Sequence, residues 1–216
     1  MASSAPTDGH AALMDSVYRR QKLIYDATRK YYLFGRDTLI AGLEARPGAT
    51  VLEVGSGTGR NLALIGRRWP GVKLHGLDIS EEMLSIARAK LGASATLAQG
   101  DATDFDARKL LGSDRFDRVV ISFAVSMIPV WRDAVRHAAG LLAPGGSLHI
   151  VDFHDFSGLP AFVRKALNGW LAKFHVAPRL DLAEFAQGVA AQAGLTCEAR
   201  RGPFGYYRLV ILRAPQ

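Results

Sequence analysis

The sequence predicts a doubly wound α/β fold, in which a mostly parallel sheet is covered by helices and closed by an antiparallel hairpin. From Thr50 onward, short β-branched or aliphatic runs alternate with helix-length amphipathic segments, which is typical of parallel strands joined by crossover helices. Near the end of the chain, only Gly202-Pro203-Phe204-Gly205 separates two strand-like runs. A gap that short cannot hold a crossover helix, so these two strands are expected to be antiparallel.

The predicted strands of the parallel part are short and apolar. They are Thr50–Val54, Lys73–Asp78, Ala95–Gln99, Phe116–Phe123 and Ser147–Asp152. The amphipathic stretches between them predict helices over Asn61–Trp69, Glu81–Leu91 and Arg132–Leu142. Pro144-Gly145-Gly146 predicts a turn immediately before the fifth strand.

The last helix and the hairpin have the clearest boundaries. Asp181 and Glu184 have the spacing of a capping box, and Gly194 supplies a stop, so we expect a helix between Asp181 and Gly194. The two hairpin strands are predicted over Thr196–Arg201 and Tyr206–Arg213.

Two helical segments lie outside this alternating pattern. We expect a flexible tail over residues 1–13 and a single domain over residues 14–216. Within that domain, residues 14–43 predict an N-terminal helical cap rich in Tyr and Arg. Residues 157–179 predict a helical segment inserted after the fifth strand. Both segments are candidates for substrate recognition.

Composition limits the partners and the location. The net charge of +7 favours an anionic partner, which could be RNA, an acidic small molecule or an anionic membrane surface. Cys197 is the single cysteine, and no Cys/His cluster has metal-ligand spacing, so we expect no metal and a reducing cytoplasm. The start of the chain lacks the pattern of a secretory signal. The longest apolar run, Val119–Val130, is shorter than the roughly 20 residues of a membrane-spanning helix.

A glycine-rich turn follows the first strand. Gly55, Gly57 and Gly59 let the chain bend sharply into a helix and approach a ligand closely. Arg60 stands where the dinucleotide-binding fingerprint has its third glycine, which argues against a nicotinamide dehydrogenase. The turn predicts a nucleoside-binding site of another kind, with a merely structural turn as the alternative.

Acidic residues around this turn are candidate ligand contacts. Asp78 closes the second strand about 20 residues further on, where a carboxylate accepts hydrogen bonds from both ribose hydroxyls. Ser80 is better placed than Asp78 to cap the next helix. Glu53 is expected to brace the turn from below.

An adenine site is expected beside Asp78. Ile79 and Met83 are candidates to sandwich the ring, with core packing as the alternative for Met83. Asp101 and Ala102, which follow the third strand, are candidates for the edge of the ring, with Asp101 accepting from its exocyclic amine.

These motifs together resemble those of the class I S-adenosylmethionine-dependent methyltransferases over about Thr50–Arg213. The resemblance implies S-adenosylmethionine as the cofactor, S-adenosylhomocysteine as its product and a seven-stranded Rossmann-like sheet with an antiparallel last strand. It also implies that Ser122 or Phe123, at the end of the fourth strand, lies near the methionine part of the donor.

The acceptor is expected to be an amino lipid. Nucleobase amino-methyltransferases usually carry an Asn/Asp-Pro-Pro-aromatic turn where this chain has Ser122-Phe123-Ala124-Val125-Ser126, so nucleic acid is not expected. The stretch from Tyr18 through Tyr25 to Asp37 resembles the diacylglyceryl-homoserine N-methyltransferases of bacterial betaine-lipid synthesis. This implies three methylations of the lipid amine. A phosphatidylethanolamine methyltransferase and a methyltransferase of another small molecule or a quinone are the alternatives.

Candidate acceptor residues are mostly aromatic, because aromatic faces hold a methylated ammonium. They are Tyr31, Tyr32, Arg36, Phe123 and Trp131, with plain packing as the alternative for most of the rings. The candidate catalytic residues are Tyr25, Tyr32 and His154. Tyr25-Asp26 resembles the Tyr-Asp element of lipid-modifying relatives, whose tyrosine approaches the methionine end of the donor, and this resemblance implies the same role for Tyr25. His154 follows the fifth strand and is a candidate proton relay, with an exposed loop histidine as the alternative.

The inserted segment presents an apolar stripe when it is written as a helix. The stripe is formed by Leu159, Phe162, Val163, Leu167, Trp170, Leu171 and Phe174, while Arg164, Lys165 and Lys173 lie away from it. A helix resting on an anionic membrane and a lid over the active site both fit this pattern. We therefore expect a cytoplasmic protein that contacts the inner membrane face. The sequence does not indicate the oligomeric state.

Overall fold

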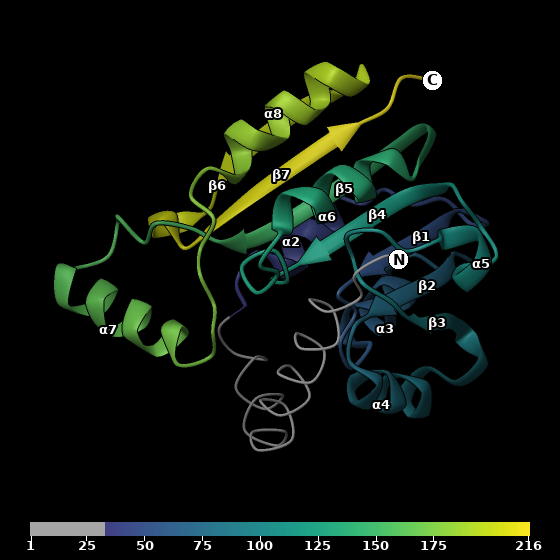
Figure 1. Cartoon of the computed structure of the whole chain (residues 1–216), viewed down its shortest axis with the longest axis horizontal. Helices are drawn as coiled ribbons and strands as arrows, with labels where there is room; N and C mark the ends of the chain where they lie inside the picture. Colours follow the sequence, from purple (N-terminus) through teal and green to yellow (C-terminus); the bar gives the residue numbers. More distant parts are fainter. Residues whose placement is uncertain (1–32) are drawn as a thin grey trace, which may run out of the picture.

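A seven-stranded sheet runs through the centre of the molecule, with helices on both of its faces (Figure 1). The computed structural model describes residues 33–216. The strand order is β3-β2-β1-β4-β5-β7-β6. The strands are β1 Thr50–Val54, β2 Lys73–Asp78, β3 Ala95–Gln99, β4 Phe116–Ser122, β5 Leu142–Phe153, β6 Thr196–Arg201 and β7 Tyr207–Arg213.

The strand directions confirm the predicted sheet. The first five strands are parallel to one another, whereas β7 is antiparallel to both β5 and β6. From β1 the following strands β2 and β3 extend the sheet to one side, and from β4 the later strands extend it to the other side. The carboxyl ends of β1 and β4 therefore form a topological switch point, where open α/β sheets bind their ligands.

The helices divide between the two faces of the sheet. They are α2 Arg36–Ala41, α3 Arg60–Arg68, α4 Glu81–Leu91, α5 Ala107–Leu111, α6 Trp131–Gly140, α7 Ala161–Ala172 and α8 Leu182–Ala193, with short 3₁₀ turns at Gly92–Ser94 and Pro203–Gly205. One apolar core joins the sheet to α5, α6 and α8, and the other joins it to α2, α3 and α7. Among the helices of residues 33–216, none has the length and apolar character needed to cross a bilayer.

The segments outside the sheet are described only in part. The predicted tail of residues 1–13 and most of the predicted cap of residues 14–43 lie outside the described residues. Helix α2 is the part of the cap that the structure describes. The inserted segment contains α7, which projects beyond the edge where β5 ends (Figure 1).

Strand β5 begins earlier than its apolar pattern predicted. The predicted turn at residues 144–146 lies inside the strand as an irregularity, because Phe116 pairs with Leu142 whereas Arg118 pairs with Ser147. A side chain on Gly146 would meet the carbonyl oxygen of Phe116 at 2.9 Å, which explains the glycine. The prediction covered only the regular part of the strand.

The caps of two helices were predicted with different success. Ser80 caps α4 as predicted, because its hydroxyl accepts a hydrogen bond from the Met83 amide at 3.3 Å. Helix α8 also begins after Asp181 as predicted, but the Asp181 side chain makes no capping bond. It forms an ion pair with Arg132 on α6 instead. The capping-box prediction is therefore wrong in its hydrogen bond and right in its boundary.

Candidate active site

The three glycines after β1 all adopt backbone conformations that disfavour side chains. The φ angles of Gly55, Gly57 and Gly59 are 74°, 52° and 69°. A Cβ on Gly55 would lie 2.7 Å from Ala124, and one on Gly59 would lie 2.7 Å from Leu91. A Cβ on Gly57 would meet no atom of the described chain within 4 Å. The outer glycines are thus required by packing, while Gly57 leaves open space on the loop.

Asp78 holds this loop from the neighbouring strand. One of its carboxylate oxygens accepts from the Gly57 amide at 2.7 Å, and the other accepts from the Ser80 amide at 2.9 Å. A carboxylate has about four acceptor positions, of which these two bonds use two. Asp78 therefore lies against the glycine loop, fixed in orientation, where the ribose contact was predicted.

Glu53 connects the two sides of the loop. Its carboxylate is buried, and Oε1 accepts a hydrogen bond from Asn61 Nδ2 at 2.6 Å. Glu53 belongs to β1 and Asn61 to the first turn of α3, so the bond ties the strand before the loop to the helix after it. Sequence reasoning assigned a bracing role to Glu53 but missed Asn61, although its place on the first helical turn was visible.

A pocket at the switch point collects residues from both sides of the loop. It is lined by Leu33, Arg36, Glu53, Gly55, Ser56, Gly57, Thr58, Arg60, Asn61 and Ser122. Ser122 thus reaches the predicted cofactor site. Arg36, a predicted acceptor contact, is buried and lines this pocket beside the glycine loop.

The predicted adenine residues form a small apolar cluster. Met83 is buried and packs with Ile79, Met127 and Phe174. Phe174 follows α7 in the inserted segment, and Met127 follows β4. The sequence predicted the pairing of Ile79 with Met83 but not the two residues from distant segments. One end of the inserted segment therefore packs against the predicted cofactor site.

The loop after β3 is held close to Asp78. The amide of Gly100 donates to the Asp78 carbonyl at 3.0 Å. Oδ1 of Asp101 accepts from the amide and the hydroxyl of Thr103 at 2.9 and 2.7 Å. This turn places Asp101 and the following Ala102 next to the end of β2, as the predicted adenine contact requires.

Two predicted acceptor aromatics are packed in the cores. Trp131 is buried under α8, with its ring centroid 5.1 Å from that of Phe185, so the structure favours packing over the predicted acceptor contact. The Phe123 ring is also buried, 4.8 Å from that of Phe153. Burial removes both rings from solvent, which agrees with the packing alternative. Candidates Tyr25, Tyr31 and Tyr32 lie outside the described residues.

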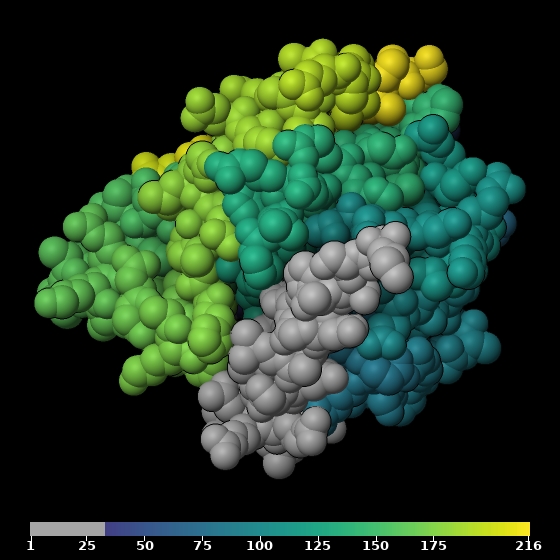
Figure 2. Space-filling view, viewed as in Figure 1, coloured from purple at the N-terminus to yellow at the C-terminus, as the bar shows by residue number. Residues whose placement is uncertain are grey.

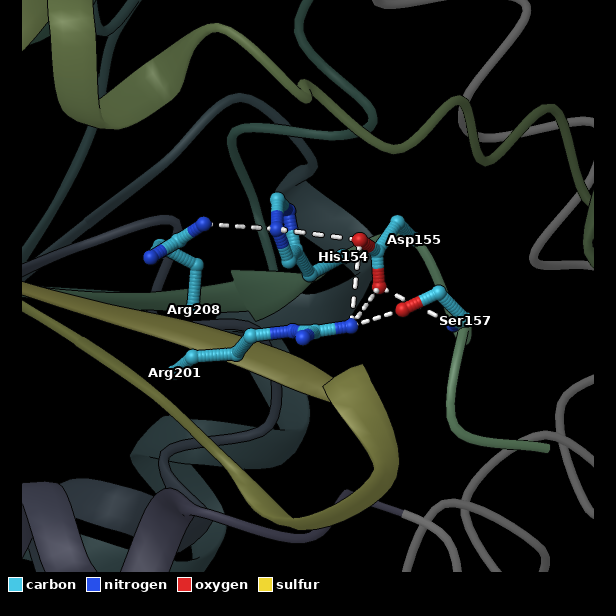
Figure 3. Close-up of polar contacts among 5 residues, drawn as sticks. All are labelled: His154, Asp155, Ser157, Arg201 and Arg208. Carbon is cyan, nitrogen blue, oxygen red and sulfur yellow. Dashed lines mark hydrogen bonds and ion pairs between the residues drawn. The ribbon is translucent and has the colours of Figure 1, made fainter.

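His154 is a buried residue and not an exposed loop histidine. The residue is 6% exposed, and its Nε2 lies 2.7 Å from the Arg208 guanidinium (Figure 3). Burial and then the charge of Arg208 lower the pKa of His154 below its usual value, so the ring is neutral at pH 7. A guanidinium only donates, so Nε2 accepts and Nδ1 carries the proton. The lone pair that a base needs is therefore occupied by Arg208, which disfavours the predicted proton relay.

The chain resembles known methyltransferases in sequence and in fold. A family model described as a methyltransferase domain matches residues 51–146. The chain is 35% identical over 192 residues to the phosphatidylethanolamine N-methyltransferase of Cereibacter sphaeroides, covering 79% of this chain and 90% of that protein. It is 29% identical over 156 residues to a ubiquinone/menaquinone biosynthesis C-methyltransferase of the same organism, and this match covers 69% of this chain and 62% of that protein.

A solved structure shares the same fold. Phosphoethanolamine N-methyltransferase 2 of Haemonchus contortus, in complex with S-adenosyl-L-methionine, superimposes with a TM-score of 0.66 at 15% identity. The match covers 84% of this chain and 52% of that one.

The chain belongs to the class I S-adenosylmethionine-dependent methyltransferases, and it is an enzyme of that class. Its cofactor is therefore S-adenosylmethionine, which the Haemonchus contortus structure also contains. The residues present fit this cofactor, because Gly57 leaves open space and Asp78 offers fixed carboxylate oxygens beside it.

Proposed function

We propose that the protein is an N-methyltransferase acting on the amino head group of a lipid. The observation that carries this proposal is the 35% identity to a phosphatidylethanolamine N-methyltransferase over 90% of that protein's length. We further propose diacylglyceryl-homoserine as the acceptor and its trimethylated betaine lipid as the product. The resemblance of residues 18–37 to the enzymes of that reaction supports this choice.

The chemistry requires alignment more than a strong base. S-adenosylmethionine would supply a methyl group bound to a positively charged sulfur. The lone pair of a neutral amine attacks this methyl carbon, so that an N–C bond forms as the S–C bond breaks. The leaving group is S-adenosylhomocysteine. Three such rounds on an ammonium group release three protons. An amine with a pKa of roughly 8 to 10 costs about 1.4 to 4 kcal/mol to deprotonate at pH 7, so a dedicated base is not essential. An occupied lone pair on His154 is compatible with this chemistry.

A surface beside α7 supports contact with a membrane. Phe162 on α7 is 77% exposed, and Phe204 in the turn between β6 and β7 is 66% exposed. The loop that leads into α7 contacts this turn, since the Gly158 amide donates to the Phe204 carbonyl at 3.0 Å. Lys165 and Lys173 are exposed on the same segment. The green surface of α7 forms one end of the molecule in Figure 2, accessible to a flat partner.

This surface has the chemistry of a helix at a lipid interface. Aromatic side chains can enter the boundary between head groups and acyl chains, and each nearby cation adds about 1 kcal/mol on an anionic surface. The other end of the segment packs Phe174 against Met83. The inserted segment thus supports both alternatives, with an outer end suited to the membrane and an inner end over the cofactor site. We propose that the protein works at the cytoplasmic face of the inner membrane.

Changing Phe162 to glutamate is expected to weaken binding to anionic vesicles by about tenfold or more. Burying a phenylalanine side chain contributes about 1.5 to 3 kcal/mol, and the added charge is repelled by anionic lipids. Co-sedimentation with vesicles measures the change. The matched control is Leu110→Glu, which alters an exposed apolar residue on α5. Equal vesicle binding by Phe162→Glu and wild type would refute the membrane surface.

The lipids of a suitable host distinguish the acceptors. In a host that makes diacylglyceryl-homoserine without methylating it, expression of the protein is expected to produce the trimethylated lipid, detected by mass spectrometry of lipid extracts. Methylated phosphatidylethanolamine without betaine lipid would identify phosphatidylethanolamine as the acceptor instead. A change confined to quinones would overturn the lipid proposal.

A further inference from the structure

A polar cluster lies at the same edge of the sheet as the cofactor pocket. It consists of His154, Asp155, Ser157, Arg201 and Arg208, and we call it the Arg208 cluster (Figure 3). Its members come from the loop after β5, the end of β6 and the start of β7. Three segments thus bring polar and charged side chains to one place.

The two arginines of the cluster have different partners. Arg201 donates to Asp155 at 2.8 Å and also contacts Ser157. Arg208 donates to the neutral ring of His154 at 2.7 Å, and it forms no ion pair with a carboxylate in residues 33–216. With His154 neutral, the five residues of the cluster carry two positive charges and one negative charge.

Two buried donors of the cluster also lack acceptors within residues 33–216. They are Nε of Arg208 and Nδ1 of His154. A buried donor without an acceptor costs about 1 to 3 kcal/mol, and more when the group is charged. Asp152 lies opposite Arg208 in the strand register, but its oxygens accept from the amides of Ser126 and Phe153 at 2.9 and 2.8 Å. The unpartnered donors and the net positive charge of the cluster indicate an anionic ligand.

The cluster borders the place where an acceptor has to lie. Ser122 at the end of β4 lines the cofactor pocket, and the next residue, Phe123, donates its amide to Val151 on β5 at 2.8 Å. His154 follows at the end of β5, and Arg208 lies on β7, the next strand along the sheet. An acceptor held at near-attack distance from a donor methyl group beside Ser122 would lie along this edge of the sheet. The Arg208 cluster is thus on the side of the pocket opposite Asp78.

We propose that Arg208, positioned by His154, binds the oxyanion of the acceptor's head group. The inference rests on the proposed function, because it assumes an amino lipid as acceptor. A planar guanidinium matches the geometry of both a carboxylate and a phosphate. In diacylglyceryl-homoserine the carboxylate is joined to the carbon that bears the amine, whereas in phosphatidylethanolamine the phosphate lies at the other end of the ethanolamine. Recognition of this anion would orient the amine toward the methyl group.

The test compares diacylglyceryl-homoserine with its methyl ester in mixed micelles. The measured quantity is kcat/KM for the acid divided by kcat/KM for the ester. This ratio is expected to be above 1 for wild type. Arg208→Gln is expected to reduce it at least tenfold, because kcat/KM for the acid falls. The amine of the ester has a different pKa from the amine of the acid. This difference affects wild type and variant equally, so it does not contribute to the change in the ratio between them. The dissociation constant for S-adenosylmethionine is expected to stay unchanged. Phosphatidylethanolamine is the third acceptor, and a loss confined to it identifies phosphate as the bound anion.

Two further variants separate binding from folding. Arg213→Gln changes an exposed arginine at the opposite end of β7 and is expected to keep the wild-type ratio. His154→Ala is expected to lower the ratio, and His154→Gln to restore part of it, because the amide oxygen still accepts from Arg208. If Arg208→Gln does not fold, Arg208→Lys takes its place. Lysine keeps the positive charge but lacks the planar guanidinium that can bind an oxyanion through two parallel hydrogen bonds, so the ratio is still expected to fall.

The outcomes distinguish the two proposals. If wild type transfers no methyl group to any amino lipid, the proposed function fails. If wild type methylates the lipid while folded Arg208→Gln, or Arg208→Lys in its place, keeps the full preference for the acid or the phosphate, only the assignment of Arg208 is overturned.

Discussion

Replacing Asp78 with alanine is expected to weaken S-adenosylmethionine binding by roughly 100-fold or more. The carboxylate holds the Gly57 and Ser80 amides and is the predicted partner of the ribose hydroxyls. Hydrogen bonds to a charged group contribute about 1.5 to 3 kcal/mol each, and the loss of two ribose contacts alone exceeds the 2.7 kcal/mol of a 100-fold change. Release of the loop adds to this loss.

Calorimetric titration with S-adenosylhomocysteine measures the effect of Asp78→Ala directly. The thermal stabilisation by the same ligand is expected to disappear in parallel, because only bound ligand stabilises the fold. Asp106→Ala is the matched control, since this exposed carboxylate caps α5 through the Lys109 amide at 3.0 Å. That variant is expected to lose stability and keep its affinity. An Asp78→Ala affinity close to wild type would remove Asp78 from the cofactor site.

Replacing Gly57 with valine is expected to lower kcat/KM to about 1% of wild type or less. The Gly57 φ angle of 52° strains any side chain, at a cost of about 1 to 3 kcal/mol in stability. A valine side chain would also enter the open space beside the pocket, where the cofactor is expected to approach the loop. Displacing a reactant by about 1 Å can cost 100-fold in rate. The loss of activity should therefore exceed the loss of stability.

Gly48→Val provides the matched control for Gly57→Val. Gly48 has a φ angle of 86°, and a Cβ there meets no atom within 4 Å, but it precedes β1 at the opposite edge of the sheet. The two variants thus share the backbone strain and differ in position. Thermal unfolding and kcat/KM are measured for both. Similar losses of activity in the two variants would mean that strain, and not the cofactor pocket, explains the effect.

The fold could be predicted from local patterns. Alternating apolar runs and amphipathic segments located the seven strands of the sheet, and the short gap before Tyr206 predicted the antiparallel hairpin. The start of β5 was missed because its irregularity depends on pairing with Phe116 on another strand. The bond expected from Asp181 failed for a similar reason, since its carboxylate has Arg132 of α6 as an alternative partner.

The cofactor site was predictable because each of its loops directly follows a strand. Gly57 and Asp78 could be placed from spacing alone, and the structure brings them within hydrogen-bond distance. Phe174 and Arg208 were not predicted, because they come from distant segments and belong to common residue types. Trp131 could not be assigned from the pattern alone, because an aromatic side chain after an apolar strand fits a core as well as a site, and the structure buries it.

Transfer of a labelled methyl group tests the central claim most directly. Purified protein is given labelled S-adenosylmethionine with diacylglyceryl-homoserine in micelles, phosphatidylethanolamine in micelles and RNA, in parallel reactions. We predict label in the extracted amino lipid, greatest with diacylglyceryl-homoserine, and little label in RNA. Transfer to RNA alone, or to neither lipid, would contradict the assignment of this methyltransferase to lipid amines.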